Sequence, residues 1–383
     1  MRLLLTAVLA SFALVAPQAA QATGIATKLA QRDSLIHGIA GDERHVFVTE
    51  PGMGVSTAGP RVVVLDRFTG REVAVVPAPP GGFKLPFTLR VPKTGHLVVL
   101  DAGGFPPTGP PKIYDYRYDR DRRGFKAELV RTVDFAGNAL AFSEDVEVLP
   151  SGEYVVSESV FGGLWLVGRD GTVRPGIANE NPMASPPLAN LGGCPFPPQR
   201  PDFRIGGLEF EALGGFAPGA GSLAVRGSDL YLSSTCQGGV QKVKIKTLLD
   251  SSRPAAERAA EIETVVQRQY SDEPESLKGI TFNRWDQRDP WIYAGDPFRL
   301  QLIRIHSRTG ERQILSRNER LFDFTVSTTF LPPVFRGFPN PLVTASDQEY
   351  RWATLNAALE SDQFRPQPRP QFPVGEFWTL NLH

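Results

Sequence analysis

The sequence predicts an all-β fold, a six-bladed β-propeller. Short runs rich in Val, Ile, Leu, Phe and Tyr are separated by turns about every ten residues, a spacing typical of all-β proteins. The chain holds 37 Gly and 34 Pro, which punctuate these runs. A similar double strand recurs six times, and each copy is followed by a second hairpin. Four strands per repeat, arranged radially, describe the blades of a propeller.

The six copies share one pattern, in which an apolar strand, a turn and a second apolar strand end in an acidic or hydroxyl residue. They span residues 37–50, 87–101, 144–158, 221–235, 278–296 and 322–347. Thr-Gly and Asp-Gly pairs in the following hairpins provide the residue that tolerates positive φ in a tight turn. Two packed β-sandwich domains are the alternative, but they do not explain six recurring copies without a linker signal.

The N-terminal residues are predicted to be a secretory signal peptide, residues 1–22. Arg2 precedes an apolar run over residues 3–15, and small residues then allow cleavage just before Thr23. The apolar run is shorter than the roughly 20 residues that a membrane span requires. We therefore expect no membrane span and an exported protein, either periplasmic or secreted.

Residues 23–383 are predicted to form a single propeller domain. The strand-like segment 377–382 is expected to pair with N-terminal residues, because a ring left open would expose two strand edges. Helical periodicity is scarce, and the best candidates for helices are residues 255–267 and 350–359.

Charge and cysteine content narrow the class of protein. Lys+Arg and Asp+Glu both number 41, so the formal net charge is zero, and no basic run is present. We therefore expect no nucleic-acid partner. Cys194 and Cys236 are the two cysteines, and an oxidising compartment favours a disulfide between them. Two buried thiols are the alternative.

The propeller prediction places residues from distant parts of the chain around one channel, because the first strand of each blade lines the axis. The inner ring of candidates is His37, Thr88, Glu144 or Asp145, Ser222, Lys278 and Asp323. A second ring, at the ends of the second strands, is Glu50, Asp101, Glu158, Thr235, Asp296 and Asp347. Carboxylates around a small aqueous cavity suit a hard divalent cation, and a histidine also admits zinc.

Structural roles for the same residues remain open. Acidic residues that end strands commonly accept backbone N–H bonds, and we assign most of the second ring to that role, with a further role open for Glu50 and Glu158. In the inner ring, Lys278 can simply be the ion-pair partner of a carboxylate. His37 can be a histidine whose hydrogen bonds are satisfied beside the channel.

The blade pattern resembles the superfamily of gluconolactonases, regucalcin-type lactonases and strictosidine-synthase-like proteins, which are six-bladed propellers. The likeness is clearest over residues 144–158 and 278–283. Residues 97–103 are also similar to the secreted yellow and royal-jelly propellers. The resemblance covers most of the mature chain, and it lies in the strand pattern of the blades.

The resemblance implies a divalent metal, which the lactonase branch holds through Glu, Asn and Asp side chains from three inner strands. These places fall near His37, Glu144 and Gly221, and Gly221 has no side chain to offer. Asp145, Asp323 or Glu50 are candidates for the missing carboxylate. The predicted metal ligands, for Ca²⁺ or Zn²⁺, are therefore His37, Glu144, Asp323 and Glu50.

The leading hypothesis is a monomeric, metal-assisted hydrolase of a small lactone or ester, with its site in the central channel. The cation would polarise the carbonyl and activate water. Asp145, which would manage the proton, and Lys278 are the candidate catalytic residues. The alternative is a non-catalytic propeller that binds a small ligand or a protein. The sequence has no nucleophile elbow, His-Glu-x-x-His, phosphate loop or Cys-x-x-Cys motif.

Overall fold

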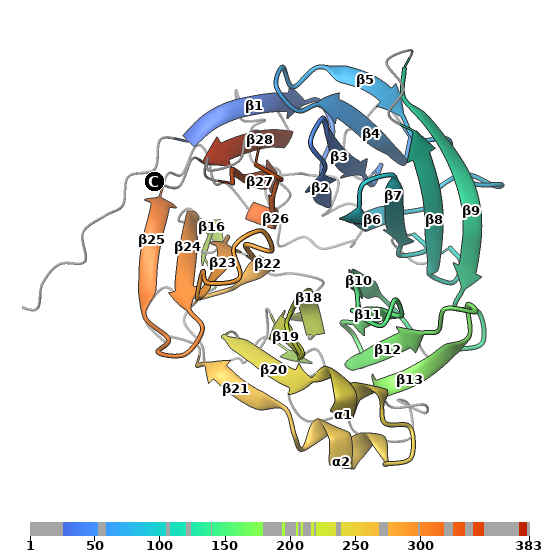
Figure 1. Ribbon diagram of the computed structural model, residues 1–383, viewed down its shortest axis with the longest axis vertical. Helices are drawn as coiled ribbons and strands as arrows, with labels where there is room; N and C mark the ends of the chain where they lie inside the picture. Colours follow the sequence, from blue (N-terminus) through green and yellow to red (C-terminus); the bar gives the residue numbers. More distant parts are fainter. Residues whose placement is uncertain are drawn as a thin grey trace, which may run out of the picture.

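The computed structural model of the protein confirms the six-bladed β-propeller. It describes residues 26–52, 59–104, 108–119, 124–138, 140–178, 194–195, 204–205, 208–209, 216–217, 220–234, 239–267, 275–297, 299–317, 325–333, 340–347 and 375–380. In these residues the strands form six four-stranded antiparallel sheets, arranged radially around one axis (Figure 1). Each sheet is one blade.

The first three blades follow one another along the chain, each running from its inner to its outer strand. Blade 1 contains β2 (Ile39–Gly41), β3 (His45–Glu50), β4 (Arg61–Asp66) and β5 (Glu72–Val75). Blade 2 contains β6 (Pro86–Lys93), β7 (His96–Asp101), β8 (Lys112–Asp119) and β9 (Lys126–Asp134). Blade 3 contains β10 (Ser143–Val148), β11 (Tyr154–Glu158), β12 (Gly163–Val167) and β13 (Val173–Ala178).

Blades 4 and 5 repeat this order, and blade 6 takes strands from both ends of the chain. Blade 4 contains β18 (Ala220–Arg226), β19 (Asp229–Ser234), β20 (Val240–Lys244) and β21 (Glu263–Val266). Blade 5 contains β22 (Lys278–Phe282), β23 (Trp291–Asp296), β24 (Gln301–His306) and β25 (Arg312–Arg317). Blade 6 contains β26 (Thr325–Phe330), β27 (Leu342–Asp347), β28 (Gly375–Leu380) and β1 (Ala26–Arg32).

Blade 6 closes the ring as the sequence predicted. The N-terminal strand β1 is its outermost strand and pairs antiparallel with the C-terminal strand β28, from Ala26 opposite Leu380 to Arg32 opposite Gly375. β28 in turn pairs with β27. The two ends of the chain therefore lie in one sheet, and the backbone hydrogen bonds of that sheet hold the first blade to the last.

The core lies between the blades, because both faces of each sheet are covered by a neighbouring sheet. On β7, Leu97 and Val99 belong to the apolar cluster shared with blade 1, whereas Val98 and Leu100 belong to the cluster shared with blade 3. Successive side chains of a strand point to opposite faces. A strand buried on both faces therefore has a continuous apolar run, which explains the Leu-Val-Val-Leu sequence.

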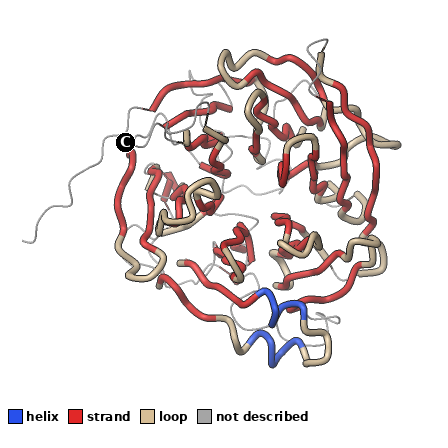
Figure 2. The backbone as a smooth tube through the Cα atoms, in the orientation of Figure 1, coloured by secondary structure: helices blue, strands red, loops and turns tan. Residues whose placement is uncertain are grey.

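Two short helices occur in the described part of the chain, α1 (Ile245–Leu249) and α2 (Ala255–Ala259), which lie on the outer rim of blade 4 (Figure 2). The prediction of one helix over residues 255–267 was therefore wrong beyond Ala259. Thr264, Val265 and Val266 are β-branched, and they form the edge strand β21 on β20 instead. The second candidate helix, over residues 350–359, lies outside the described residues.

Two pairs of very short strands complete the described structure between blades 3 and 4. They are β14 (Cys194–Pro195) with β17 (Phe216–Ala217), and β15 (Arg204–Ile205) with β16 (Leu208–Glu209). Among the described residues, no helix is long and apolar enough to cross a membrane.

Phe47 provides a test of the packing between blades. Its fully buried ring packs at 5.0 Å from Tyr118 and 5.8 Å from Phe125, measured between ring centroids. We expect Phe47→Ala to lower the free energy of unfolding by about 3–5 kcal/mol, because it leaves a cavity between blades 1 and 2. Phe68, with 61% of its surface exposed, is the matched control, and Phe68→Ala is expected to change that energy by about 0.5 kcal/mol or less. Denaturant unfolding measures both, and equal effects would contradict this packing.

Candidate functional site

Irregular pairing shapes the first residues of the inner strands where they face the axis. The register between the first and second strand shifts between Ser143 and Val146 in blade 3, and between Ala220 and Leu223 in blade 4. Equivalent shifts occur near the start of β6, β22 and β26. Because a bulge breaks the alternation of side chains, it can turn two successive residues toward the same space.

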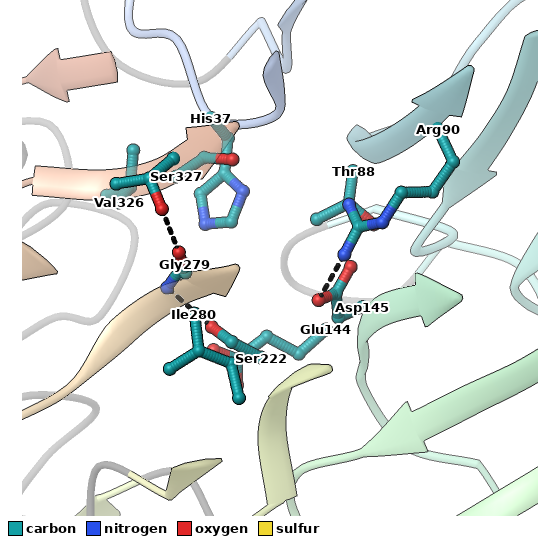
Figure 3. Close-up of a pocket in the computed structure, with 11 residues that line it drawn as sticks. His37, Thr88, Arg90, Glu144, Asp145, Ser222, Gly279, Ile280, Val326 and Ser327 are labelled. Carbon is teal, nitrogen blue, oxygen red and sulfur yellow. Dashed lines mark hydrogen bonds and ion pairs between the residues drawn. The ribbon is translucent and has the colours of Figure 1, made fainter. Parts of the chain in front are cut away.

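These bulges surround an axial cavity of about 20 Å³, which is enough for about one water molecule. Figure 3 shows the lining side chains converging from different blades. The lining residues are His37, Thr88, Arg90, Glu144, Asp145, Ser222, Gly279, Ile280, Val326, Ser327 and Thr328. The structure thus brings together five residues of the predicted inner ring: His37, Thr88, Glu144, Asp145 and Ser222.

Close contact between backbones keeps the axis narrow. Gly279, in the left-handed region at φ 57°, lies so close to blade 6 that an added Cβ would be 2.6 Å from Ser327 Cα. Its amide donates to Ser222 Oγ at 2.7 Å. Only glycine combines this conformation with such an approach, so residue 279 fixes the spacing of blades 4, 5 and 6 at the cavity.

His37 contributes a neutral imidazole to the cavity. Its Nδ1 lies 3.1 Å from the carbonyl oxygen of Phe87, which can only accept, so Nδ1 carries the proton and Nε2 is an acceptor. The ring stacks on Phe87 with centroids 3.5 Å apart. Burial, together with the positive charge of Lys278, lowers the pKa of His37 from 6.5 to about 3. The ring is therefore neutral at physiological pH.

Glu144 is held from two sides. Lys278 Nζ, from the start of β22, contacts Glu144 Oε1, and Ser159 Oγ donates to Oε2 at 2.6 Å. Lys278 does not line the cavity itself, but its ammonium contacts a carboxylate that does. The ion pair joins blades 3 and 5 across the axis, and both side chains are at least 87% buried, with exposed fractions of 5% and 13%.

Asp145 is paired with Arg90, a residue that the sequence analysis missed. Arg90 Nη2 donates to Asp145 Oδ2 at 2.7 Å, and its Nε donates to Glu147 at 3.1 Å. The amide of Leu223 also donates to Asp145, at 2.8 Å. Burial raises the pKa of Asp145 to about 6, although the charge of Arg90 opposes that rise.

Arg90 also divides the channel. A second cavity, of about 100 Å³, lies beyond it and is lined by later residues of the inner strands, including Glu147, Phe282 and Phe330. Arg90 borders both cavities. One signal for it was present in the sequence: Arg90 is a charged residue between the apolar residues Leu89 and Val91 in the strand Pro86–Lys93.

The second ring has the capping role that the sequence predicted for most of it. Asp101 accepts from the amides of Lys84, Leu85 and Gly103 at 2.7–3.0 Å. Glu158 and Asp296 likewise accept hydrogen bonds from backbone amides. Thr235 lies outside the described residues, and only the backbone of Asp347 is described.

Glu50 lies apart from the axial cavity. Its oxygens accept from Arg32 Nε at 2.6 Å and from Arg61 Nε at 2.7 Å, and its side chain is fully buried. It thus connects β1 of blade 6 to blade 1. The two arginines occupy both oxygens, so Glu50 does not join the candidate metal ligands His37 and Glu144. Asp323, the fourth candidate, lies outside the described residues.

The described residues do not fit a divalent cation as they are arranged. No cluster of three or more His, Cys, Asp or Glu side chains in that part of the chain could hold an ion. Glu144 is paired with Lys278, and Asp145 is paired with Arg90. Gly221, whose added Cβ would lie 2.9 Å from Glu144 Oε1, has no side chain and therefore offers no side-chain ligand.

The neutral state of His37 predicts a pH dependence of stability. Because the pKa of His37 is lower in the folded protein than in the unfolded chain, its neutral ring stabilises the fold fully above about pH 6.5, and this contribution is lost as the pH falls toward 3. Between pH 6 and pH 4 we expect the wild type to lose about 1.4 kcal/mol per pH unit more than His37→Gln. Denaturant unfolding at several pH values measures this, and parallel pH dependences would contradict the assignment.

Comparison with known proteins gives similarity in structure alone. No protein-family model matches the sequence, and no curated protein matches it significantly. The luciferin-regenerating enzyme is similar with a TM-score of 0.52 and 12% identity, over 94% of this chain and 96% of that chain. A gluconolactonase from Xanthomonas campestris is similar with a TM-score of 0.51 and 12% identity, over 94% and 89%.

A structural genomics protein from Bacteroides thetaiotaomicron is similar with a TM-score of 0.53 and 12% identity, over 93% of this chain and 75% of that chain. Similarity at 12% identity establishes the fold alone, and the chemistry must be argued from the residues of the site. The resemblance inferred from the blade pattern is confirmed as a distant one: the chain has the propeller fold of gluconolactonase and the luciferin-regenerating enzyme.

Proposed function

We propose that the protein hydrolyses a small lactone or ester at the axial cavity. The observation that supports this is a neutral His37, with Nε2 as an acceptor, on a cavity that can hold a water molecule. A lysine ammonium lies at the same end of the channel, where its charge acts on His37. Lactone hydrolysis needs these two elements, a base for water and a positive charge for the carbonyl oxygen.

In the proposed reaction, His37 Nε2 accepts a proton from the water while the water oxygen attacks the carbonyl carbon. Negative charge then develops on the carbonyl oxygen, which the Thr88 hydroxyl stabilises from the cavity wall and the charge of Lys278 stabilises from beside the cavity. Thr88 Oγ1 is buried and has no hydrogen-bond partner among the residues that the structure describes, so it is available to donate. The C–O bond breaks, and His37 returns the proton to the leaving alkoxide, which gives a hydroxy acid or an acid and an alcohol.

His37 suits this role better than Asp145, which the sequence analysis chose to manage the proton. Asp145 accepts from Arg90, Leu223 and Val146, so its oxygens are engaged. His37 Nε2, by contrast, is the acceptor nitrogen of a neutral ring that lines the cavity. No divalent cation takes part in the proposed reaction, because Glu144 is paired with Lys278.

A lactone and ester panel tests the proposal. We expect the mature protein to open at least one aldonolactone, simple γ- or δ-lactone, or aryl ester, with proton release followed at constant pH. His37→Gln is expected to lower kcat by a factor of about 10²–10⁴, the usual contribution of a general base. His306, on the outer strand β24, is the matched control, and His306→Gln is expected to keep the activity. The proposal fails if no substrate turns over or if His37→Gln remains fully active.

The size of the cavity supports a second candidate, a propeller that binds a ligand without catalysis. About 20 Å³ holds one water molecule but no complete lactone, so a substrate must bind with only its carbonyl end in the cavity. Calorimetric titration separates the two candidates. Lactone binding without turnover, lost on substitution of Thr88 or Lys278, would favour the binding protein.

We also propose that the protein is exported with its signal peptide removed, and that Cys194 and Cys236 form a disulfide. Both proposals are supported by the sequence, through its N-terminal pattern and its two cysteines. Residues 1–25 and Cys236 lie outside the described residues. In a bacterial host we expect an exported product whose intact mass matches a chain that begins at Thr23. It should take up two alkyl groups after reduction and none before it. An uncleaved product, or alkylation without a reductant, would contradict these proposals.

A further inference from the structure

We infer that Lys278 provides the positive charge of the axial site, and that the site functions without a divalent cation. The inference concerns the residues of the proposed function, and its catalytic consequence rests on that proposal. Its test measures ion binding, however, so it can succeed or fail independently of any hydrolase activity.

The first support is the contact that Lys278 makes. It lies at the start of β22, 134 residues from Glu144 in the sequence, and crosses from blade 5 to the carboxylate on blade 3. The other oxygen of Glu144 accepts from Ser159 at 2.6 Å. A buried carboxylate needs a counter-charge and hydrogen bonds for both oxygens, and these two residues supply them.

The second support is the lack of a side-chain ligand from blade 4 beside Glu144. Gly221 on β18 packs directly against it, and any side chain at that position would begin 2.9 Å from Glu144 Oε1. Blade 4 therefore brings its backbone to the carboxylate but no ligand. A divalent cation prefers six or more oxygen ligands if it is Ca²⁺, or four ligands if it is Zn²⁺. Blade 4 cannot contribute a side-chain ligand unless Glu144 moves.

The third support is the balance of charge around the cavity. Glu144 and Asp145 are the two carboxylates of the bulge in blade 3. Glu144 is paired with Lys278, and Asp145 shares Arg90 with Glu147. Among the residues that the structure describes around Glu144 and Asp145, a divalent ion would meet two cations, and every carboxylate there already has a cationic partner. To bind Glu144, the ion would have to displace the ammonium of Lys278.

The position of Lys278 also indicates which ligands the site favours. Lys278 is a hydrogen-bond donor on a flexible stem, with a side chain that is 13% exposed. Its ammonium group can turn from Glu144 toward a developing oxyanion while it stays close to the Glu144 carboxylate. The ligands that such a site favours are carbonyl compounds whose oxygen gains negative charge.

Ion binding by the intact mature protein tests this inference. Titration of the wild type with Ca²⁺, Mn²⁺ and Zn²⁺, followed by calorimetry and by the electron paramagnetic resonance of Mn²⁺, is expected to show no Glu144-dependent binding up to about 1 mM, the weak end of protein calcium sites. Lys278→Met leaves Glu144 without its cation. We expect this variant to bind Mn²⁺ about tenfold or more tightly than the wild type, and Lys278→Met/Glu144→Gln to lose that gain.

Lys244 provides the matched control, because it forms an ordinary ion pair with Asp229 at 2.8 Å, between the two middle strands of blade 4, β19 and β20. Lys244→Met should leave Mn²⁺ affinity unchanged. The inference is overturned if the wild type binds one equivalent of a divalent ion and Glu144→Gln abolishes it. It is also overturned if folded Lys278→Met gains no affinity. If Lys278→Met does not fold, the comparison of wild type with Glu144→Gln decides the question alone.

Discussion

The pairing of β1 with β28 is the constraint on which the rest of the structure depends. Every blade is apolar on both faces, so each needs a neighbour on both sides, and only a closed ring gives every blade two. The closing sheet contributes Val326 and Val343 to a core cluster that also contains Val46 and Val63 of blade 1. Glu50 adds a buried ionic link, because it binds Arg32 on β1 as well as Arg61 within its own blade. Closure thus joins the two ends of the chain and buries the last apolar faces together.

A closed ring also defines the axis on which the candidate site lies. The inner strands approach so closely that glycine is required where backbones meet, as at Gly279, and the remaining space is small and polar. Carboxylates in such a place are stable only with counter-charges, which come from other blades. Arg90 and Lys278 meet this requirement, and they join blade 3 to blades 2 and 5. The same contacts that stabilise the axis set the charge, the protonation and the size of the cavity.

The similarity to gluconolactonase and the luciferin-regenerating enzyme is a similarity of fold. The three chains have similar architecture at 12% identity, so the axial position is provided by the fold. The chemistry at that position depends on a few side chains. In this chain a glycine stands where the resemblance implied a ligand, and a lysine is paired with the carboxylate that remains.

The sequence by itself determined the number of blades, the closing strand and five of the residues around the cavity. Strand periodicity and internal repeats are local patterns, so they can be recognised without knowledge of the fold. It did not predict the bulge that turns both Glu144 and Asp145 to the cavity, the role of Arg90, or the end of the helix at Ala259. Tertiary structure decided these. Arg90 and Asp145 are 55 positions apart in the sequence, and Glu144 and Lys278 are 134 positions apart. The edge strand β21 forms because it can pair with β20. Contacts between distant segments choose among conformations that local sequence leaves nearly equal in energy.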